Sequence, residues 1–572
     1  MDELLLPNDS LPGLVAVSPP WSRQDFVRQA LTLSARLQTE GMACAALYFD
    51  DAAAFACAYL ACAHAGVSMV VAPNLGRDNL SWASKQASVW LTDQDALPVG
   101  LPCWHLGATA SINLDQTPAN AARLKADTPL WLKTSGSSGE PKLICKTVEQ
   151  FQTEATAIAE RSLPDAGMAD ATIEAVIGSV STQHLYGMSF RIMLSLCAGW
   201  PIFRQQCIFP ETLLESSLAL KRVIWMSSPT LLRHLADASL ASMRPGQIAG
   251  IFSAGGKLDA DVSQRLKTKL GCWPLEIYGS TETGVIAYRQ GNTSWQIFPS
   301  ARHGVDQRGT LWINSPWSDG LQQTADVVTL DQTGFQLLGR YDRIIKLADK
   351  RISLDQVEQT LMQHDWISDA FCNQHAEHGR INACVALSHA GIDTFREKGR
   401  SHVIGLLKQH LGQHFDAVVL PRRWRFVSQL PRNSQGKLPR ADTEALMKDR
   451  PDTPTWAAVP PTAPGEHVFE AEVPLDLIHF GGHFANFPLV PGMVELDWAI
   501  RLARSSGLAA PEASLRQVEV LKFKQFLKPA DRARLSLKAL SDANKLAFSL
   551  HNEQGECASG RLVFAPHGSV AP

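Results

Sequence analysis

Residues 133–142 read KTSGSSGEPK and follow the short apolar run Leu-Trp-Leu at 130–132. Two glycines among four hydroxyl-bearing residues make a flexible loop that can turn several backbone N–H groups toward an anion, and Lys142 adds a positive charge. The spacing differs from the G-x-x-x-x-G-K-[ST] pattern of a Walker loop. By itself the stretch is also compatible with a solvated Ser/Gly linker, so its meaning depends on its surroundings.

Alternating helix and strand patterns surround this loop. Ser22 can cap an amphipathic helix that runs to about residue 39, and residues 43–49 then have the pattern of a strand. Because such segments repeat to about residue 320, the sequence predicts a layered α/β architecture.

One apolar stretch is long enough to cross a membrane. Residues 52–72 contain no Asp, Glu, Lys or Arg. Gly66 divides the stretch, so a buried helix over 52–65 followed by a buried strand over 67–71 explains it better. We therefore expect no integral membrane segment.

Composition excludes several classes of protein. The 572 residues predict three or four domains, at about 150 residues per domain. The 53 basic and 56 acidic residues nearly cancel, so we expect no nucleic-acid partner. The 11 cysteines are an odd number without a C-x-x-C pair, which favours free thiols and a cytoplasmic protein. The start of the chain, MDELLLPNDSLPG, lacks the basic residues of a signal peptide.

The clearest domain boundary is the run DRPDTPTWAAVPPTAPGE at 449–466, which contains five prolines and no apolar periodicity. This composition predicts a semi-rigid linker, which we place at residues 449–465. Residues 466–572 then contain one predicted helix at about 493–503 and strand-like runs at 517–523, 534–539 and 545–550. A helix packed on an antiparallel sheet, an α+β domain, fits this pattern.

Further polar runs follow the first loop in a fixed order: YGSTET at 278–283, TAD at 324–326, GRYDRIIK at 339–346 and LPRNSQGK at 430–437. This ordered set resembles the adenylate-forming superfamily of acyl-CoA synthetases, aryl-CoA ligases, luciferases and peptide-synthetase adenylation domains. The resemblance covers roughly residues 10–448. It implies a large α/β domain over 1–339 and a small, mobile α+β subdomain over 340–448.

The resemblance also implies an ATP site. The family's phosphate loop corresponds to Thr134, Ser135, Gly136, Ser137, Ser138, Gly139 and Lys142, and the rest of the nucleotide site to Gly255, Gly256, Lys257, Tyr278, Gly279, Ser280, Thr281, Asp326 and Arg340. In the family, the Tyr278 position stacks on adenine and the Thr281 position contacts the α-phosphate. The Asp326 position binds the ribose hydroxyls.

Four more positions take family roles in the reaction itself. Glu282 would hold Mg²⁺, a hard cation that prefers oxygen ligands. Asp342 would be the hinge, and Lys437 the mobile lysine that bridges the substrate carboxylate and the α-phosphate. A carboxylate attacking a phosphate brings two anions together, which explains the need for these cationic groups. His184 occupies the place of an acyl-pocket histidine in many family members, although a packed core histidine would look the same.

One departure from the family concerns the thiol acceptor. The family pattern K-x-x-G-x-R-I corresponds here to KLADKRI at 346–352, so Asp349 replaces a glycine in the loop that lines the pantetheine tunnel. We expect the acceptor to be the phosphopantetheine of an acyl carrier protein rather than free CoA, and both remain open.

A second group of polar residues lies after the linker, where residues 479–498 read HFGGHFANFPLVPGMVELDW. Pro491-Gly492 ends a loop before an apolar helix, whose N-terminus offers free N–H groups and a positive dipole end. Asp497 lies one turn into that helix among apolar and aromatic neighbours, which predicts a raised pKa for its carboxyl. The simpler interpretation is a first-turn acid favoured by the dipole.

This segment resembles the hotdog-fold 3-hydroxyacyl-carrier-protein dehydratases over about residues 465–565. His483 matches the catalytic histidine, and Asp497, 14 residues later, matches its acidic partner, whereas Glu495 is off the family spacing. The family mechanism implies that His483 takes the α-proton, the Gly492 N–H polarises the thioester carbonyl and Asp497 protonates the departing hydroxyl. Histidine and acid meet across a dimer in the family, which implies a homodimer.

Together these patterns predict a multidomain chain with an α/β N-domain, a small α+β subdomain and a C-terminal α+β hotdog domain. The predicted function joins an AMP-forming acid–thiol ligase for a small aryl or fatty acid to a dehydratase, as in aryl-polyene and xanthomonadin-type pathways. Two alternatives for the hotdog domain stay open: a non-catalytic dimerisation and carrier-docking module, and a thioesterase.

Overall fold

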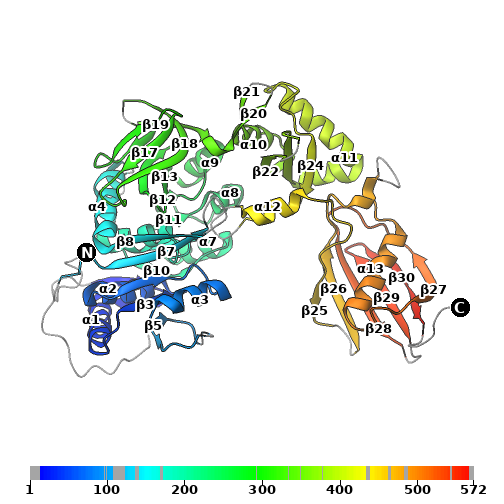
Figure 1. Cartoon of the computed structure of the whole chain (residues 1–572), viewed down its shortest axis with the longest axis horizontal. Helices are drawn as coiled ribbons and strands as arrows, with labels where there is room; N and C mark the ends of the chain where they lie inside the picture. Colours follow the sequence, from blue (N-terminus) through cyan, green and yellow to red (C-terminus); the bar gives the residue numbers. More distant parts are fainter. Residues whose placement is uncertain are drawn as a thin grey trace. The chain divides into compact units, whose positions relative to one another are not determined.

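A computed structural model shows the fold (Figure 1). It describes residues 13–95, 97, 99–106, 123–135, 141–165, 167, 172–291, 293–332, 334–347, 350–375, 378–432, 438–461, 465–481, 487–540 and 544–565. The chain forms two compact units, of which the first comprises residues 1–341 and 432–437. The second comprises residues 342–431 and 438–572.

The N-terminal unit begins with a mostly parallel sheet. Its strands lie in the order β6 (Cys103–His105), β5 (Val89–Thr92), β3 (Cys44–Tyr48), β4 (Ser68–Val71), β7 (Pro129–Ser135) and β8 (Pro141–Thr147). Neighbours pair in parallel except β7 and β8, which form an antiparallel hairpin. The accompanying helices are α1 (Arg23–Thr39), α2 (Ala52–Ala65) and α3 (Arg77–Gln86).

Local signals in the sequence explain these elements. Ser22 accepts a hydrogen bond from the Asp25 N–H at 3.1 Å and caps α1, as predicted. Asp51 caps α2, and Gly66 ends α2 with a left-handed φ of 75°. The predicted buried helix and the strand after it are therefore confirmed. Within the described part of the chain, every helix is too short or too polar to cross a membrane.

A 13-stranded sheet forms the rest of this unit. Its order is β16 (Arg302–Val305), β17 (Thr310–Asn314), β18 (Leu321–Leu330), β19 (Gly334–Arg340), β15 (Trp295–Ile297), β14 (Gly284–Gln290), β13 (Pro274–Ser280), β12 (Ile248–Ser253), β11 (Val223–Ser227), β9 (Ala175–Gly178), β10 (Ile202–Gln206), β1 (Leu14–Val17) and β2 (Trp21–Ser22). Strands β13, β12, β11, β9, β10 and β1 pair in parallel, whereas the strands from β16 to β14 pair antiparallel.

Helical segments follow the strands of this larger sheet. They are α4 (Val148–Asp165), α5 (Leu185–Gly187), the π-helix η2 (Met188–Leu194), α6 (Ser195–Ala198), α7 (Pro210–Leu218), α8 (Pro229–Asp237) and α9 (Ala260–Leu270). The predicted layered α/β architecture of the N-terminal part is confirmed.

The C-terminal unit contains a small subdomain and a larger sheet domain. The small subdomain has the hairpin β20 (Ile344–Leu347) and β21 (Lys350–Ser353), the sheet β22 (Ile367–Gln374), β23 (Ile381–Leu387) and β24 (Arg423–Val427), and the helices α10 (Leu354–Met362), α11 (His389–Gly412) and α12 (Arg440–Met447). Apolar side chains from these elements, apart from α12, share one hydrophobic core. Met447 of α12 belongs to a second cluster with Cys384 and Ala386 of β23.

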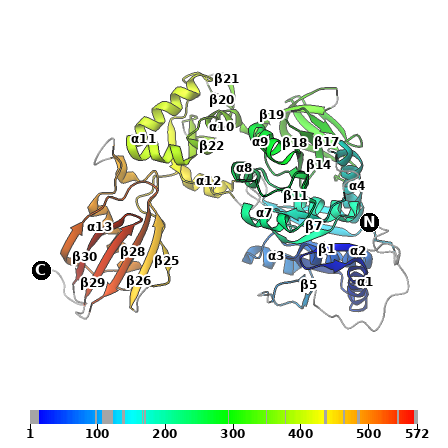
Figure 2. The same ribbon diagram turned by 180° about the vertical axis from the view of Figure 1, so that it is seen from behind.

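The sheet domain that ends the chain is antiparallel. Its order is β25 (Ala457–Val459), β26 (Glu466–Glu472), β28 (Arg532–Ala539), β29 (Lys545–Asn552), β30 (Gly555–Phe564) and β27 (Leu515–Phe523). Helix α13 (Gly492–Ser505) packs on the sheet around Trp498 and Ala499, and Figures 1 and 2 show the domain from opposite sides. The predicted helix and strands are confirmed. Strand β25 falls within the predicted linker, where it pairs with β26.

Candidate nucleotide and acyl-thioester sites

The predicted phosphate loop joins the two strands of the β7–β8 hairpin. In the register of this hairpin Thr134 lies opposite Lys142, which is exposed. The residues between the strands, Gly136, Ser137, Ser138 and Gly139 among them, lie outside the described residues, as do the side chains of Thr134 and Ser135. The structure therefore shows where the loop begins and ends, because strand pairing fixes both ends.

Three predicted nucleotide residues from separate motifs meet at one place. Asp326 on β18 and Arg340 on β19 lie directly opposite each other in the antiparallel register, with Arg340 Nη1 3.8 Å from Asp326 Oδ1. The Tyr278 hydroxyl, at the end of β13, donates a hydrogen bond to the Asp326 carboxylate. Burial, with the Asp326 charge as a second cause, raises the pKa of Tyr278 well above 10. Tyr278 is therefore a neutral hydrogen-bond donor to a charged acceptor.

Aromatic packing holds the Tyr278 ring in place. Its centroid lies 5.4 Å from that of Trp295 and 5.4 Å from that of Phe335. Offset and edge contacts of this kind stabilise the orientation of a ring. The tyrosine thus reaches Asp326 from a fixed position.

A tight turn after Tyr278 presents Thr281 and Glu282. A Cβ on Gly279 would lie 2.2 Å from the Gly284 carbonyl oxygen, so only glycine fits there. The Ser280 N–H donates to Thr283 Oγ1 at 2.9 Å, which closes the turn. Thr281 and Glu282 are partly exposed at its tip, where their side chains can reach a ligand.

A buried glutamate that the sequence analysis missed supports this turn. Glu154 of α4 is 1% exposed and accepts hydrogen bonds from the Val285 N–H and the Ser189 hydroxyl, each at 2.7 Å. The neighbouring Gly284 has a φ of 67°. A sequence signal existed, because Glu154 lies on the same helical face as the apolar residues Phe151 and Ile158.

The predicted adenine segment follows the neighbouring strand. Gly255, Gly256 and Lys257 come after β12 and are exposed, and Gly255 has a left-handed φ of 88°. Strands β12 and β13 are parallel neighbours, so this segment and the turn after Tyr278 leave the same edge of the sheet. Ligands commonly bind at this edge of an α/β sheet.

His184 lies at the N-cap of α5, directly before the π-helix η2, and is partly buried. Next to it, the Tyr186 hydroxyl donates to the Ser227 carbonyl oxygen at 3.1 Å. A π-helical segment often marks a functional site. Whether His184 lines an acyl pocket stays a prediction.

One of the remaining predicted ligase residues lies at the boundary between the two units. The division falls between Tyr341 and Asp342, and Asp342 is the residue predicted as the hinge. Lys437 and Asp349 lie outside the described residues, so their predicted roles stay predictions.

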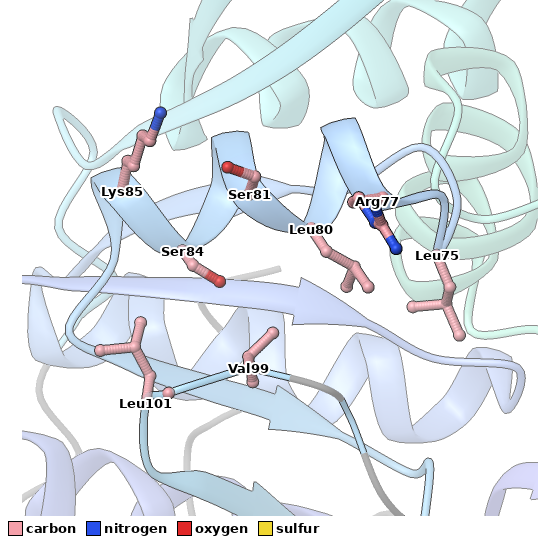
Figure 3. Close-up of a pocket in the computed structure, with 9 residues that line it drawn as sticks. Leu75, Arg77, Leu80, Ser81, Ser84, Lys85, Val99 and Leu101 are labelled. Atoms are coloured by element: carbon pink, nitrogen blue, oxygen red, sulfur yellow. The ribbon is translucent and has the colours of Figure 1, made fainter.

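A cavity of about 710 Å³ elsewhere in the N-terminal unit lies between α3 and residues 99–101 (Figure 3). Leu80 and Ser84 of α3 point toward Val99 and Leu101 across it. None of the predicted site residues lines this cavity, so we assign it no part in the nucleotide site.

The second candidate site is at the N-terminus of α13. A Cβ on Gly492 would lie 2.6 Å from ring atoms of Phe523 on β27, so the ring of Phe523 lies directly beside this glycine. His483 lies outside the described residues. The structure therefore shows the Gly492 side of the predicted site and leaves the histidine a prediction.

The two carboxyls of this helix have very different surroundings. The Asp497 side chain is 46% exposed, and its Oδ2 lies 2.6 Å from Nε of Arg501, one turn along the helix. Glu495 is 3% exposed, and burial raises the pKa of its carboxyl to about 8. The prediction of apolar surroundings for Asp497 is therefore wrong in the single chain, because the apolar face of α13 is the one that carries Glu495.

Comparison with known proteins adds two family matches. The profile described as AMP-binding enzyme matches residues 14–305, just over half of the chain, and the ApeI-like profile, described as ApeI dehydratase, matches residues 461–561. A 4-coumarate–CoA ligase of Cereibacter sphaeroides is 25% identical over 324 residues, which are 53% of this chain and 69% of that protein. A 3,4-dihydroxybenzoate–[aryl-carrier protein] ligase of Bacillus anthracis is 22% identical over 370 residues, 62% of this chain and 84% of that protein.

A solved structure shares the fold of most of this chain. The anthranilate CoA ligase AuaEII in complex with anthranoyl-AMP has a TM-score of 0.64 and 16% identity, and the match covers 78% of this chain and 97% of that one. The α/β part of the chain thus has the fold of adenylate-forming enzymes. The antiparallel sheet with α13 agrees with a hotdog dehydratase domain.

Proposed function

The chain belongs to the AMP-binding enzyme family and carries an ApeI-like dehydratase domain, and from this premise we propose a bifunctional enzyme of acyl-thioester chemistry. Its ligase part activates a carboxylic acid with ATP as an acyl-adenylate and passes the acyl group to a pantetheine thiol. Its C-terminal domain dehydrates 3-hydroxyacyl-carrier-protein thioesters to enoyl thioesters. We place this pair of reactions in aryl-polyene-type pigment or fatty-acid-like biosynthesis.

The observation that carries the ligase proposal is the meeting of Tyr278, Asp326 and Arg340. An ionised carboxylate is an acceptor that suits the two hydroxyls of a ribose. The Arg340 guanidinium and the Tyr278 hydroxyl hold that carboxylate in place from two sides. This arrangement supports Asp326 as the ribose-binding residue and the adjacent edge of the sheet as the nucleotide site.

The described residues fit a magnesium ion that arrives with ATP. No group of three or more His, Cys, Asp or Glu that could hold a metal is found among them. Mg²⁺ is usually bound through one or two carboxylates together with substrate phosphates and water. Glu282, partly exposed at its turn, would supply that carboxylate. The ion would neutralise phosphate charge.

Adenylation joins two anions, and the chain must offset their repulsion. Lys437 would place its ammonium between the attacking carboxylate and the α-phosphate. Backbone N–H groups of the loop at 136–140 would hold the outer phosphates. Asp342, at the division between the two units, would be the hinge that brings Lys437 to the reaction.

The names of similar proteins support a proposal for the substrate class. The names of the ligases compared above specify aromatic acids, namely 4-coumarate, 3,4-dihydroxybenzoate and anthranilate. They support an aryl acid as the substrate of this chain, with a fatty acid as the alternative. An acyl carrier protein is the proposed acceptor and partner, because Asp349 replaces a glycine of the loop that lines the pantetheine tunnel in the family.

The dehydratase proposal rests on His483, Gly492 and Asp497. His483 would take the α-proton of the thioester, and the N-terminal N–H groups of α13, with the helix dipole, would polarise the carbonyl. The ring of Phe523 lies directly beside Gly492, at the N-terminus of α13. Asp497 is the acidic partner on the family spacing.

An exposed apolar surface supports a homodimer through this domain. Phe523 and Val520 of the edge strand β27 are 49% and 60% exposed, and Met493 of α13 is 68% exposed. Phe487 and Phe526, at 41% and 59%, extend the same kind of surface. Large exposed apolar side chains at an unpaired sheet edge are characteristic of an interface. The proposed occupant is a second copy of this chain.

The oxidation state of the cysteines supports a proposal for the cellular compartment of this protein. All 11 lie among the described residues and none forms a disulfide. This supports a reducing compartment, and we propose the cytoplasm.

One experiment tests each half. A screen of ATP–pyrophosphate exchange over aryl and fatty acids tests the ligase, and no exchange with any acid would contradict it. The full chain is then incubated with a 3-hydroxyacyl thioester in the absence of ATP. An enoyl product supports the dehydratase, free thiol indicates a thioesterase, and no change indicates a docking module.

A further inference from the structure

Two buried ionisable residues of the N-terminal unit take no direct part in the proposed adenylation chemistry. Lys146 on β8 is 2% exposed, and Glu154 on α4 is 1% exposed. The Lys146 ammonium donates a hydrogen bond to the Trp317 carbonyl oxygen at 2.6 Å. Burial lowers the pKa of Lys146, and the charge of Glu154 acts against that shift. The cost of burying these two charges is therefore offset by hydrogen bonds and by their mutual attraction.

The two side chains belong to a network that holds the backbone of Val285, in the first turn of chain after Gly284 on β14. The Val285 N–H donates a hydrogen bond to Glu154 Oε1 at 2.7 Å. On the other side of the same residue, Trp317 Nε1 donates to the Val285 carbonyl oxygen at 2.9 Å. Because side chains from other elements hold both polar backbone groups of Val285, the start of β14 is fixed relative to α4.

Gly284 joins this anchored residue to the turn at 280–283, which carries the proposed magnesium ligand. Its φ is 67°, and a Cβ there would lie 2.4 Å from Glu154 Oε1 and 2.5 Å from Trp317 Cδ1. The Glu154 carboxylate and the Trp317 ring therefore pack directly against the backbone where the 280–283 turn ends. Any shift of that turn would disturb both contacts.

The other end of the network continues from the predicted phosphate loop. Lys146 lies four residues after Lys142 on β8, and α4 begins at Val148, directly after this strand. Glu154 also accepts a hydrogen bond from the Ser189 hydroxyl of the π-helix η2 at 2.7 Å. The network thus connects the strand that leaves the phosphate loop with the 280–283 turn and with η2.

We propose that Glu154 and Lys146 are positioning residues of the adenylation site, which hold the 280–283 turn at a fixed place relative to β8. The inference rests on the proposed ligase function. One triphosphate would contact Lys142 from the loop and, through its metal ion, Glu282 from the turn, so the separation of the two is part of the binding. Glu154 acts through the backbone of the turn, and Lys146 acts through the charge of Glu154. Removing a group that orients a metal ligand typically lowers metal affinity or activity by about 10- to 100-fold.

The test compares Glu154→Ala, Glu154→Gln and a matched control, Glu160→Ala, in the full chain. Glu160 is an exposed glutamate of the same helix. ATP–pyrophosphate exchange is measured against Mg²⁺ concentration. We expect Glu154→Ala to raise the Mg²⁺ concentration for half-maximal exchange by about 10- to 100-fold. Glutamine keeps an oxygen that can accept from the Val285 N–H, so Glu154→Gln should restore most of the wild-type response, and the control should match wild type.

A double-mutant cycle with Glu282→Gln separates positioning from a general loss of stability. If Glu154 acts through Glu282, adding Glu154→Ala to Glu282→Gln should lower exchange little further, because residues that act as a unit have non-additive effects. The same fold-loss from Glu154→Ala in both backgrounds would overturn the inference.

Hydrogen exchange of residues 280–286, in the chain without ATP or Mg²⁺, gives a readout that does not depend on activity. Exchange should be faster in Glu154→Ala and, to a smaller extent, in Ser189→Ala, because both loosen the hold on this segment. Glu154→Gln and Glu160→Ala should match wild type. If Glu154→Ala does not fold, Ser189→Ala decides, and unchanged exchange of 280–286 in that variant would overturn the inference.

Failure of the inference is distinguishable from failure of the ligase function. Wild-type pyrophosphate exchange together with an unchanged Mg²⁺ requirement in a folded Glu154→Ala chain would overturn the inference and leave the ligase function standing. No pyrophosphate exchange by the wild-type chain with any acid would overturn both.

Discussion

Arg400 and Asp476 form a buried salt bridge in the C-terminal unit, with Nε of the arginine 2.7 Å from Oδ1 of the aspartate. Arg400 belongs to α11 of the small subdomain, whereas Asp476 lies in the sheet domain and is 2% exposed. Arg450 adds a second contact, with its Nε 3.1 Å from the same oxygen. Leu475 packs into the hydrophobic core of the small subdomain. The two domains of this unit therefore share a buried interface that is both ionic and apolar.

Asp476→Asn should destabilise the C-terminal unit strongly, because it removes the buried counter-charge of two partly buried arginines, Arg400 and Arg450. Removing one partner of a buried pair costs about 3–5 kcal/mol. Urea unfolding of the full chain measures the change. The matched control is Asp452→Asn, since the Asp452–Arg501 pair is more than half exposed on both sides and should contribute at most about 1 kcal/mol. Equal effects of the two substitutions would contradict the importance of the Asp476 cluster.

Lys437→Ala should abolish adenylate formation while leaving ATP binding largely intact, because the proposed lysine acts on the reacting oxygens. Pyrophosphate exchange measures the first and equilibrium binding of ATP the second. Lys448→Ala, a lysine outside the predicted motifs, is the control. Exchange near the wild-type rate in Lys437→Ala would show that this lysine is not the catalytic one.

Asp349→Gly should raise transfer of the acyl group to free CoA relative to the carrier protein, because it restores the small residue expected in the pantetheine tunnel and removes a negative charge near an anionic acceptor. The two acceptors are compared side by side at equal thiol concentration. If the wild-type chain already transfers to free CoA as fast as to the carrier protein, the proposed preference fails.

Mixed dimers should recover dehydratase activity if His483 and Asp497 meet across the interface. His483→Ala chains and Asp497→Asn chains each lack intact pairs, but a mixed dimer has one. Random exchange makes half of the dimers mixed, so two-fold symmetry predicts recovery of about a quarter of the wild-type activity. Adenylation by the same sample is the internal control. No recovery after demonstrated subunit exchange would place the pair within one chain or remove one of its members.

Glu495→Gln should change how stability depends on pH. Burial raises the pKa of Glu495 from 4.5 to about 8, so the folded chain binds the proton more tightly than the unfolded chain. This group therefore lowers stability progressively as pH rises from about 4.5 to about 8, and it costs nothing below that window. At 1.36 kcal/mol per pKa unit, the glutamine variant should gain up to about 5 kcal/mol over wild type across the window. Urea unfolding at pH 5, 7 and 9 measures the difference, and a constant difference would contradict the burial of this carboxyl.

Local sequence signals were sufficient to predict several individual helices and strands. Ser22 at the start of α1, Gly66 after α2 and the apolar periodicity of α13 each depend on a few neighbouring residues. The ordered motifs likewise indicated both families, because motif residues and their spacing are read directly from the chain. Those signals are local, so tertiary packing did not have to be known.

The sequence could not predict which strands pair or how deeply each charged side chain is buried. Proline content predicted a linker at 449–465, but β25 within it pairs with β26, since backbone pairing depends on a partner strand. Spacing pointed to Asp497, whereas the burial of Glu495 depends on which face of α13 meets the sheet.

The sequence by itself thus indicated the two families, the fold class and many of the individual helices and strands. Tertiary structure alone decided which of those groups meet: Asp326 reaches Arg340 because β18 and β19 pair in one register, and Tyr278 reaches them from a third strand. The physical reason is that burial and long-range pairing are properties of the packed chain. They set the surroundings, and hence the pKa and the partners, of residues that local sequence cannot distinguish.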